Sequence, residues 1–198
     1  ATREQILTEL RGGLRYVRHG GALLALTVLA FATTSLALPV RAFLPVFADD
    51  AAHLSQMMTM LGAGAVVGAL VVAWLGQFDH MGRTLLLVQV VFGGIVATFA
   101  LLPITGFSYV LLFLSGVALL MIFSLTNSLV QLTVPDELRG RVISIYLVAF
   151  RGGMPLGSLI SGYFITQFSA PTVIAANGLL LSLVAAGFLM GNRQVREL

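Results

Sequence analysis

The chain has neither cysteine nor lysine, and only 10% of its 198 residues are charged. Without cysteine there is no disulfide framework, no thiol nucleophile and no cysteine-based metal site. The sequence also contains no Ser/His/Asp, His-Glu-x-x-His, P-loop or Gly-x-Gly-x-x-Gly arrangement. We therefore predict no catalytic residues, no metal site and no cofactor, which argues against the alternative of an intramembrane enzyme.

Hydrophobic residues, by contrast, make up 58% of the chain, and its mean hydropathy is +0.99. They gather into six stretches, at 20–48, 55–76, 84–103, 107–133, 142–168 and 170–190. Each has about 20 residues or more, and a helix of about 20 residues crosses a hydrocarbon core of ~30 Å. The sequence therefore predicts an all-α membrane protein whose six transmembrane helices occupy residues 20–190.

Arginine is distributed unevenly among the connections between these stretches. It precedes the first stretch and follows the second, fourth and sixth, at Arg3, Arg11, Arg15, Arg18, Arg83, Arg139, Arg141, Arg193 and Arg196. The connections near 49–55, 103–108 and 169–172 contain none. By the positive-inside rule we expect both termini to be cytoplasmic. Because the arginines are spread over loop ends and form no basic stripe, we predict no nucleic-acid partner.

The two ends of the chain are shorter and more polar than the spans. Residues 1–19 place apolar side chains at helical spacing, opposite arginines, at Ile6, Leu7, Leu10, Leu14 and Val17. This pattern predicts an amphipathic linker helix on the cytoplasmic membrane surface, not a signal peptide. Such a helix commonly joins two membrane bundles, so we expect the chain to be the second half of a longer protein, ending in a cytoplasmic tail at 191–198.

Polar residues inside the spans are candidates for a substrate pathway. Arg151 lies about 10 residues into its span, near the membrane midplane, where a charge costs ~2.5–3.5 kcal/mol unless it meets water or a partner. Arg41 stands between two prolines, which predict a kinked outer end of the first span. The predicted pathway residues are Arg41, Asn127, Gln131 and Arg151. The alternatives are outward snorkelling for Arg41 and structural pairing or snorkelling for Arg151.

Small residues and a proline mark the second and fifth spans. Glycine spaced by four residues lets helix backbones approach closely, and proline allows a helix to bend. The predicted packing and hinge positions are Gly64, Gly68, Gly153, Pro155 and Gly157. Packing alone would also account for the glycines.

Two charged connections are candidates for a cytoplasmic latch. In the first, Asp79 is expected to cap the next helix and Gly82 to permit the turn. In the second, acids precede a helix that begins with arginines. The predicted latch residues are Asp79, Gly82, Arg83, Arg139 and Arg141. A simple capped turn is the alternative for the first connection, and a lipid-anchored loop for the second.

The order and spacing of these segments resemble the major facilitator superfamily along essentially the whole chain. Asp-His-Met-Gly-Arg at 79–83 resembles the Asp-Arg-x-Gly-Arg core of the superfamily's cytoplasmic signature loop, in its second-half copy. Val-Gln-Leu-Thr-Val-Pro-Asp-Glu-Leu-Arg-Gly-Arg-Val-Ile-Ser at 130–144 and Gly-Gly-Met-Pro-Leu-Gly-Ser at 152–158 resemble helices ten and eleven of its enterobactin-exporter and macrolide-efflux branch. Segments 14–19 and 44–48 are also similar to that branch.

This resemblance implies the C-terminal half, helices seven to twelve, of a transporter that works by alternating access. Each half of such a transporter contains two inverted three-helix repeats. The first, second, fourth and fifth spans would line the cavity, and the third and sixth would face lipid. His80 departs from the family pattern, which usually has Arg or Lys there. In the latch, Asp79 would pair with Arg139, Arg141 or an arginine of the other half in only one state.

The resemblance further implies a proton-coupled exporter of amphiphilic small molecules, drugs or siderophores, in a bacterial inner membrane. Its partners would be the small-molecule substrate, the lipid bilayer and a missing N-terminal six-helix half. Because no acid lies within a span, we expect the coupling residue in that missing half. The alternatives are an importer of the same superfamily and a non-transporting membrane anchor or assembly module.

Overall fold

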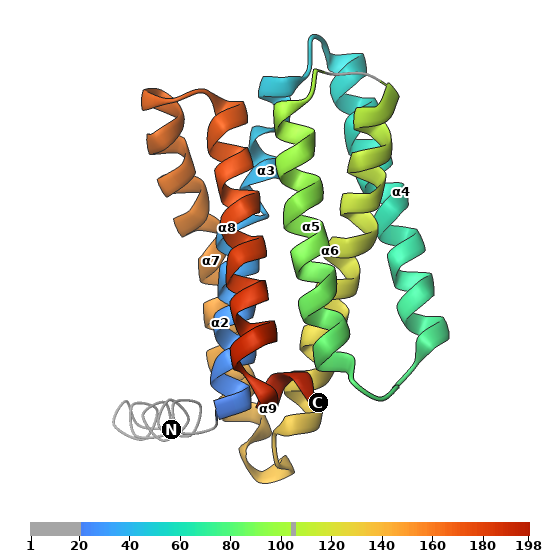
Figure 1. Ribbon diagram of the computed structural model, residues 1–198, viewed down its shortest axis with the longest axis vertical. Helices are drawn as coiled ribbons and strands as arrows, with labels where there is room; N and C mark the ends of the chain where they lie inside the picture. Colours follow the sequence, from blue (N-terminus) through green and yellow to red (C-terminus); the bar gives the residue numbers. More distant parts are fainter. Residues whose placement is uncertain (1–20, 104–105) are drawn as a thin grey trace.

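A computed structural model describes residues 21–103 and 106–198, apart from the side chain of Glu137. In this part of the chain all regular structure is helical, and the long helices run side by side along the longest axis of the molecule (Figure 1). The elements in chain order are α2 (Gly21–Leu36), α3 (Pro39–Phe43), η1 (Leu44–Phe47), α4 (Ala51–Leu75), α5 (Met81–Leu101), α6 (Gly106–Thr133), η2 (Asp136–Leu138), α7 (Arg139–Gln167), α8 (Ala170–Gly191) and α9 (Arg193–Arg196). The amphipathic helix predicted for residues 1–19 lies outside the described residues.

The prediction of six transmembrane helices is confirmed. Six helical segments are long and apolar enough to cross a membrane, and they have between 21 and 29 residues. At 1.5 Å per residue these lengths correspond to about 31–44 Å, which exceeds a hydrocarbon core of ~30 Å. The all-α membrane fold class predicted from the sequence is therefore correct.

The first span is interrupted, as its prolines predict. It consists of α2, α3 and η1, with a break at Ala37 and Leu38. Pro39 opens α3 and Pro45 lies in η1, and neither can donate a backbone hydrogen bond to the preceding turn. The second half of this span therefore takes a different course from α2.

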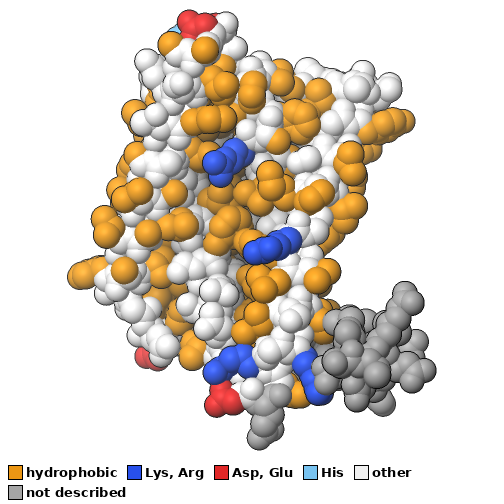
Figure 2. Space-filling model, turned by 180° about the vertical axis from the view of Figure 1, so that it is seen from behind, with side chains coloured by type: hydrophobic (Ala, Val, Ile, Leu, Met, Phe, Trp, Pro, Cys, Tyr) orange, Lys and Arg blue, Asp and Glu red, His pale blue; other side chains and the backbone are white. Residues whose placement is uncertain are grey.

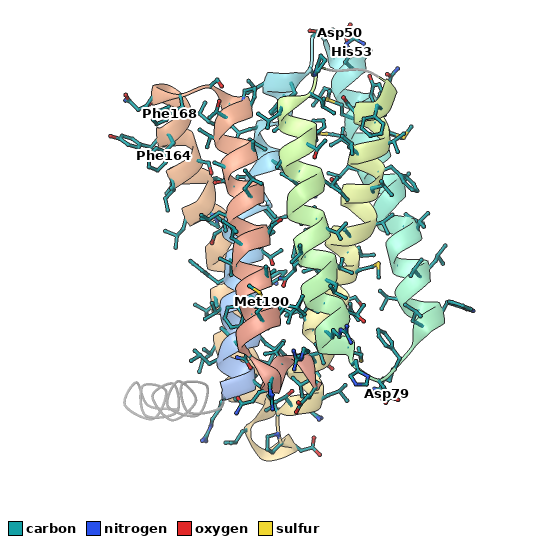
Figure 3. All side chains as sticks on the ribbon, in the orientation of Figure 1. Asp50, His53, Asp79, Phe164, Phe168 and Met190 are labelled. Carbon is teal, nitrogen blue, oxygen red and sulfur yellow. The ribbon has the colours of Figure 1, made fainter. Side chains whose placement is uncertain are left out.

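The bundle has two ends, which we name the Asp50 end and the C-terminal end. Figure 3 shows Asp50 and His53 at the first and Asp79 at the second, close to the chain terminus. Asp50 caps α4, because its Oδ1 accepts a hydrogen bond of 2.7 Å from the backbone N–H of His53. Phe164 and Phe168 point outward near the Asp50 end, as aromatic side chains do at membrane surfaces.

The turn between α4 and α5 differs from its sequence prediction. Gly76 and His80 adopt positive φ angles of 59° and 66°, and these two residues reverse the chain. His80 occupies the cap position of α5, and α5 has no side-chain cap. The expectations that Asp79 caps α5 and that Gly82 permits the turn are therefore wrong. Histidine is among the few non-glycine residues that tolerate this conformation.

The predicted tail at 191–198 forms the short helix α9, which packs against α5, α2 and α8. Asn192 caps it by accepting a hydrogen bond of 3.2 Å from the backbone N–H of Val195. Val195 is fully buried. Gly82, inside α5, lies directly beneath the carbonyl oxygen of Val195, so that even a methyl group there would collide with it. Gly82 therefore provides a contact surface for the tail.

The long helices pair in a pattern that relates the two halves of the chain. The first repeat comprises α2 to η1, α4 and α5, and the second comprises α6, α7 and α8. Extensive contacts join α4 with α6, α2 with α7, α5 with α8 and also α5 with α6. The first three pairings are preserved when the two repeats are exchanged: the second helix of each repeat meets the first helix of the other, and the two third helices meet each other. Because each repeat has three spans, the second runs through the bundle in the opposite direction, which gives an inverted pair.

Glycine lies at the closest approach of each of these three pairs. A methyl group on Gly64 of α4 would collide with the carbonyl oxygen of Phe113 in α6. On Gly157 of α7 it would collide with the carbonyl oxygen of Ser35, and on Gly93 of α5 with that of Gly178 in α8. In each pair backbone rests on backbone, which side chains larger than hydrogen would prevent.

The helices differ in how much of their surface is covered. On α4 the buried residues are only Met57, Leu61, Gly64 and Gly68, and on α7 they are Val142, Tyr146, Gly153, Gly157 and Ser161. More than half of the first span's apolar window is buried, compared with 17% on each of α4 and α7. A broad face of α4 and α7 is therefore without a partner among the described residues.

Candidate functional site

Two adjoining hollows form a groove on this uncovered side of the bundle. Helices α3, α4 and α6 line the first hollow, and α4, α6 and α7 line the second. Leu120 and Phe123 of α6 border both, so the two hollows are neighbours. The helices involved belong to the first, second, fourth and fifth spans, which are the spans that the family resemblance places at a cavity. We refer to the two hollows together as the groove.

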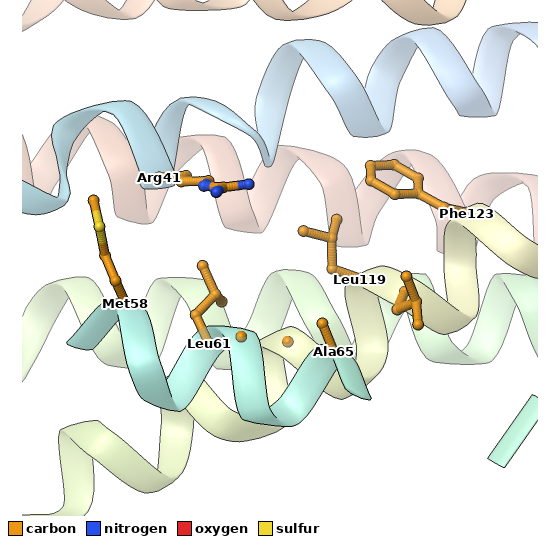
Figure 4. A pocket seen from close by; sticks show the side chains of 9 residues that line it. Arg41, Met58, Leu61, Ala65, Leu119 and Phe123 are labelled. Carbon is orange, nitrogen blue, oxygen red and sulfur yellow. The ribbon is translucent and has the colours of Figure 1, made fainter. Parts of the chain in front are cut away.

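The first hollow has a volume of about 200 Å³ and contains Arg41. Its other lining residues are apolar or glycine: Met58, Leu61, Gly62, Ala65, Gly116, Leu119, Leu120 and Phe123. Figure 4 shows the Arg41 guanidinium extending along the hollow toward Leu119, away from Met58 and the Asp50 end. Arg41 therefore lines the hollow in this structure.

The second hollow has a volume of about 520 Å³ and contains Asn127. Its other lining residues are Ala69, Val72, Ala73, Leu120, Phe123, Ser124, Tyr146, Leu147 and Phe150. The rings of Phe123 and Phe150 meet edge to face, 5.0 Å apart, and thereby connect α6 with α7. Tyr146 lies 5.8 Å from Phe150, so three aromatic rings gather on one side of this hollow.

Gln131 and Arg151 lie beside the groove and line neither hollow. Gln131 is exposed one turn beyond Asn127 on α6, on the same helix face. Arg151 is exposed one turn beyond Leu147 on α7, again on the same face. Figure 2 shows basic side chains at mid-height among hydrophobic ones on one side of the molecule, with acidic ones confined to its two ends. The structure thus brings Arg41 and Asn127 into the groove and places the other two candidates at its edge.

The groove has a positive electrostatic character. Arg41 is the charged residue of the first hollow, and among the described residues no acid lines either hollow. The described acids are Asp49, Asp50, Asp79, Asp136 and Glu197, all outside the six spans. Over residues 21–103 and 106–198 no group of three His, Asp or Glu side chains is arranged to hold a metal ion.

The predicted latch residues lie at the C-terminal end, and Arg139 has a different partner from the one proposed. Arg139 Nη2 forms an ion pair of 2.6 Å with Asp136 Oδ1, three residues earlier. Asp79 forms no ion pair with Arg139 in this conformation. Since the pair is expected in only one of two states, its formation stays a prediction.

Pro155 leaves α7 unbroken but changes its hydrogen bonding. The helix is continuous from Arg139 to Gln167, with Pro155 inside it. Because proline has no N–H, the carbonyl of Arg151 loses its usual donor four residues later. Arg151, in the middle of the span, thus has a backbone carbonyl without its usual helical donor as well as a charged side chain.

Sequence reasoning missed the aromatic cluster and one buried hydrogen bond. Tyr146 and Phe150 are one helical turn apart, a spacing that would have indicated a shared face. Gln89, fully buried on α5, donates a hydrogen bond of 2.7 Å from Nε2 to Thr33 Oγ1 on α2. No local pattern relates these two positions, which are 56 residues apart.

Comparison with known proteins gives a family for the chain. A family model described as transmembrane secretion effector, of the MFS type, matches residues 1–198. The chain is 28% identical over 164 residues to the multidrug efflux pump Tap of Mycolicibacterium fortuitum, an alignment that covers 80% of this chain and 40% of that protein. The chain thus spans less than half the length of this relative. No solved structure matches it.

The match along the full chain agrees with the helical fold, the six apolar spans and the inverted repeats. The family consists of membrane transporters and not of enzymes. The chain therefore belongs to the transmembrane secretion effectors of the major facilitator superfamily.

Proposed function

We propose that the chain is the C-terminal half of a proton-coupled secondary transporter that exports amphiphilic small molecules, such as drugs or siderophores, by alternating access. The observation that supports this most is the groove, which is mainly apolar and aromatic, with the polar side chains of Arg41, Ser124 and Asn127 in its lining. Such a lining is typical of small-molecule sites. The name of Tap as a multidrug efflux pump supports export over import.

The other wall of the pathway would come from an N-terminal six-helix half. The groove is open on one side, and α4 and α7 expose broad apolar faces beside it. Because the alignment covers 40% of Tap, a relative of this kind has room for a second bundle. In this arrangement the first two helices of each repeat face the other half, while α5 and α8 present apolar residues such as Leu87 and Leu183 to lipid.

The orientation follows from the charges. The C-terminal end contains Arg83, Arg139, Arg141, Arg193 and Arg196, whereas the Asp50 end has no arginine in its connections. Under the positive-inside rule the C-terminal end is cytoplasmic, in the inner membrane of a bacterium. The latch at that end consists of Asp79, Gly82, Arg83, Arg139 and Arg141. In the opposite transport state Asp79 pairs with an arginine.

Each pathway residue has a role in this scheme. Arg41 and Asn127 contact substrate in the hollows, and Phe123 and Phe150 provide stacking surface. Gln131 and Arg151 act nearer the missing half. Proton coupling requires a group that changes protonation within the pathway. Among the described residues no Asp or Glu lies within a span, and His53, in the first turn of α4, lines neither hollow. The other half therefore supplies the coupling residue.

The test uses inverted vesicles from cells that produce the native protein. Three probes are added: cationic ethidium, neutral Nile red and anionic dansyl-undecanoate. We expect respiration-driven accumulation of at least one probe, and its abolition by a protonophore. Phe150→Ala, inside the groove, should slow accumulation, whereas Phe107→Ala, on α6 but outside the groove, should not.

Three outcomes would contradict the proposal. Accumulation only in right-side-out vesicles would indicate an importer. Accumulation that resists the protonophore would exclude proton coupling. A native protein that moves no probe in either orientation would favour the anchor or assembly module.

A further inference from the structure

We propose that the hollow around Arg41 is an anion-binding subsite, and that the transporter therefore prefers amphiphiles with a carboxylate or phosphate group. This inference rests on the proposed export function and specifies the charge of the exported molecule. The anionic group would bind the guanidinium of Arg41, and the apolar body would extend along the groove over Phe123 toward Phe150.

The position of Arg41 is set by the break in the first span. Pro39 opens the short helix α3 after the interruption at Ala37 and Leu38, and Arg41 lies on this separate segment. Its side chain extends toward Leu119 in the middle of the groove (Figure 4). A side chain that snorkelled to the nearer membrane surface would instead extend toward the Asp50 end. The guanidinium is thus presented to the interior of the hollow.

Arg41 has no counter-charge in this part of the protein. Its side chain forms neither an ion pair nor a hydrogen bond with the described residues. Its neighbours in the hollow, such as Met58, Leu61 and Leu119, are apolar. An arginine without a partner at membrane depth is costly, and a bound anion removes part of that cost. Because guanidinium is planar and offers paired N–H groups, carboxylate and phosphate match it best.

The shape of the groove fits an amphiphile better than a small inorganic anion. The hollow around Arg41, of about 200 Å³, adjoins the second hollow of about 520 Å³. The connection runs past Phe123, which borders both, and reaches the ring of Phe150 that it contacts. A charged group at one end of an apolar, partly aromatic channel is complementary to a molecule with one anionic end and a hydrophobic body.

A membrane phospholipid also has these features, but it suits the site less well. Its headgroup lies at the bilayer surface, whereas the Arg41 guanidinium points away from the Asp50 end of the bundle. A lipid would have to sink its headgroup into the bundle to reach the guanidinium. We therefore assign the subsite to the transported solute, and lipid is an outcome that the experiment can detect.

The binding test compares dansyl-undecanoate with its uncharged N-methylamide, which has the same apolar body. Dansyl fluorescence reports binding to the purified native protein in nanodiscs of phosphatidylcholine. We expect the wild-type protein to bind the anion about tenfold more tightly, as a charge-assisted contact would provide. Arg41→Gln should abolish this preference, and Arg41→Lys should retain part of it. Arg193→Gln, a control that removes an exposed arginine of α9, should leave the preference intact.

A second variant keeps the test informative if Arg41→Gln does not fold. Met58→Glu leaves Arg41 in place and adds a carboxylate to the same hollow, where Met58 is 43% exposed. It should reduce anion binding about tenfold while binding of the amide is unchanged. Size-exclusion profiles identify the variants that are folded.

Several results would overturn the subsite while leaving the proposed function standing. One is export of ethidium or Nile red by a wild-type protein that binds both dansyl probes equally. Another is an anion preference that persists in Arg41→Gln or in Met58→Glu. A third is phosphatidylglycerol that copurifies with the wild-type protein but not with Arg41→Gln, together with equal binding of the two dansyl probes. If no probe is exported in any vesicle orientation, it is the export function that fails.

Discussion

The amide of Gln89 lies at the centre of the bundle with only one of its two polar atoms bonded. Its Nε2 donates to Thr33 Oγ1 over 2.7 Å, and Thr33 in turn donates to the carbonyl of Leu29 over 2.8 Å. The Oε1 atom of Gln89 is buried and has no hydrogen-bond partner among the described residues. In an apolar interior, removing a polar group often costs less stability than leaving its former partner without a hydrogen bond.

This asymmetry gives the first prediction. Gln89→Leu should change stability by no more than about 1 kcal/mol, because Thr33 keeps its bond to Leu29. Thr33→Val should cost about 1–3 kcal/mol, because it leaves the whole Gln89 amide unsatisfied. Unfolding by SDS in mixed micelles measures both values. A larger loss for Gln89→Leu than for Thr33→Val would show that the amide itself holds α5 against α2.

Asp50 gives a prediction about pH. The backbone N–H of His53 is the main cause that lowers the pKa of the Asp50 carboxylate below its usual value of 3.8. A lowered pKa in the folded state means that the cap stabilises α4 above the unfolded pKa and is lost as the pH falls through the folded one. The protection of the amides at 51–54 against hydrogen exchange, taken relative to the intrinsic rate at each pH, should therefore fall below about pH 4. Asp50→Asn, which keeps an accepting oxygen, should remove this pH dependence, and persistence of the dependence would mean that another group causes it.

At the residue scale the sequence identified Arg41 and Asn127 correctly as unusual polar residues within spans, because a polar side chain in an apolar stretch stands out. It could not show that Arg41 points into the groove, since that direction depends on how α3 is set against α4 and α6. Gly82 was selected for the wrong reason. Its spacing indicated a turn, but its neighbour is Val195, more than 100 residues away along the chain.

At the scale of elements, the glycines of α4, α5 and α7 fall into two kinds, those in close contact with a neighbouring helix and those in open space. Gly64 on α4 rests on the backbone of α6, whereas a methyl group on Gly62 would meet nothing within 4 Å. Gly153 and Gly152 on α7 form a similar pair, as do Gly93 and Gly94 on α5. Each of these three helices therefore contains its own internal control.

The α4 pair supplies the next prediction. Gly64→Ala should destabilise the protein by about 1–3 kcal/mol, because the added methyl group must push α4 away from the carbonyl of Phe113. Gly62→Ala should be neutral or slightly stabilising, since alanine favours helix over glycine by about 1 kcal/mol. Thermal unfolding in detergent compares them. Equal effects would contradict the backbone contact between α4 and α6.

The contact of the tail with α5 can be tested in the same way. Gly82→Ala should displace α9, because the methyl group would occupy the place of the Val195 carbonyl oxygen. Gly94→Ala, in open space on the same helix, is the matched control. We expect protease cleavage within residues 192–198 to become about tenfold faster in Gly82→Ala only, because a loss of roughly 1.4 kcal/mol raises the open population tenfold. Unchanged cleavage would mean that the tail does not depend on this contact.

The positions of the elements were predictable, and their partners were not. Long apolar runs and the prolines at 39 and 45 determine where spans lie and where the first one breaks. The spans are apolar all round, so hydrophobic periodicity does not reveal which face is covered. Gly64 and Gly68 indicated close packing of α4, but only the assembled bundle shows that the partner is α6.

At the scale of the whole molecule, the latch connects the structure to the transport cycle. Arg139 pairs with Asp136, and Asp79 has no ion pair with it. If Asp79 pairs with an arginine only in the other state, Asp79→Asn should shift the balance between states and slow transport roughly fivefold or more. Asp49→Asn, at the opposite end of the bundle, is the control and should not affect transport.

The same variants allow a direct measurement of the two states. Because this chain has no cysteine, Ala73→Cys places the one thiol of this half in the second hollow, and any cysteine of the other half is replaced by serine. Its rate of labelling by an impermeant maleimide from the cytoplasmic side should change in Asp79→Asn and stay constant in Asp49→Asn. Unchanged labelling and transport in Asp79→Asn would rule out the latch.

The exchange of helices between the two repeats also constrains how the protein is made. Each close glycine crossing joins one helix of the first repeat to one of the second, so three inserted helices alone have none of them. During synthesis α4 can meet α6 only once residue 133 has entered the membrane. The crossing of α2 with α7 waits for residue 167, and that of α5 with α8 for residue 191. The six-helix bundle is therefore the smallest unit in which all three crossings can form. The first repeat remains in the bilayer without these contacts until the second repeat has been inserted.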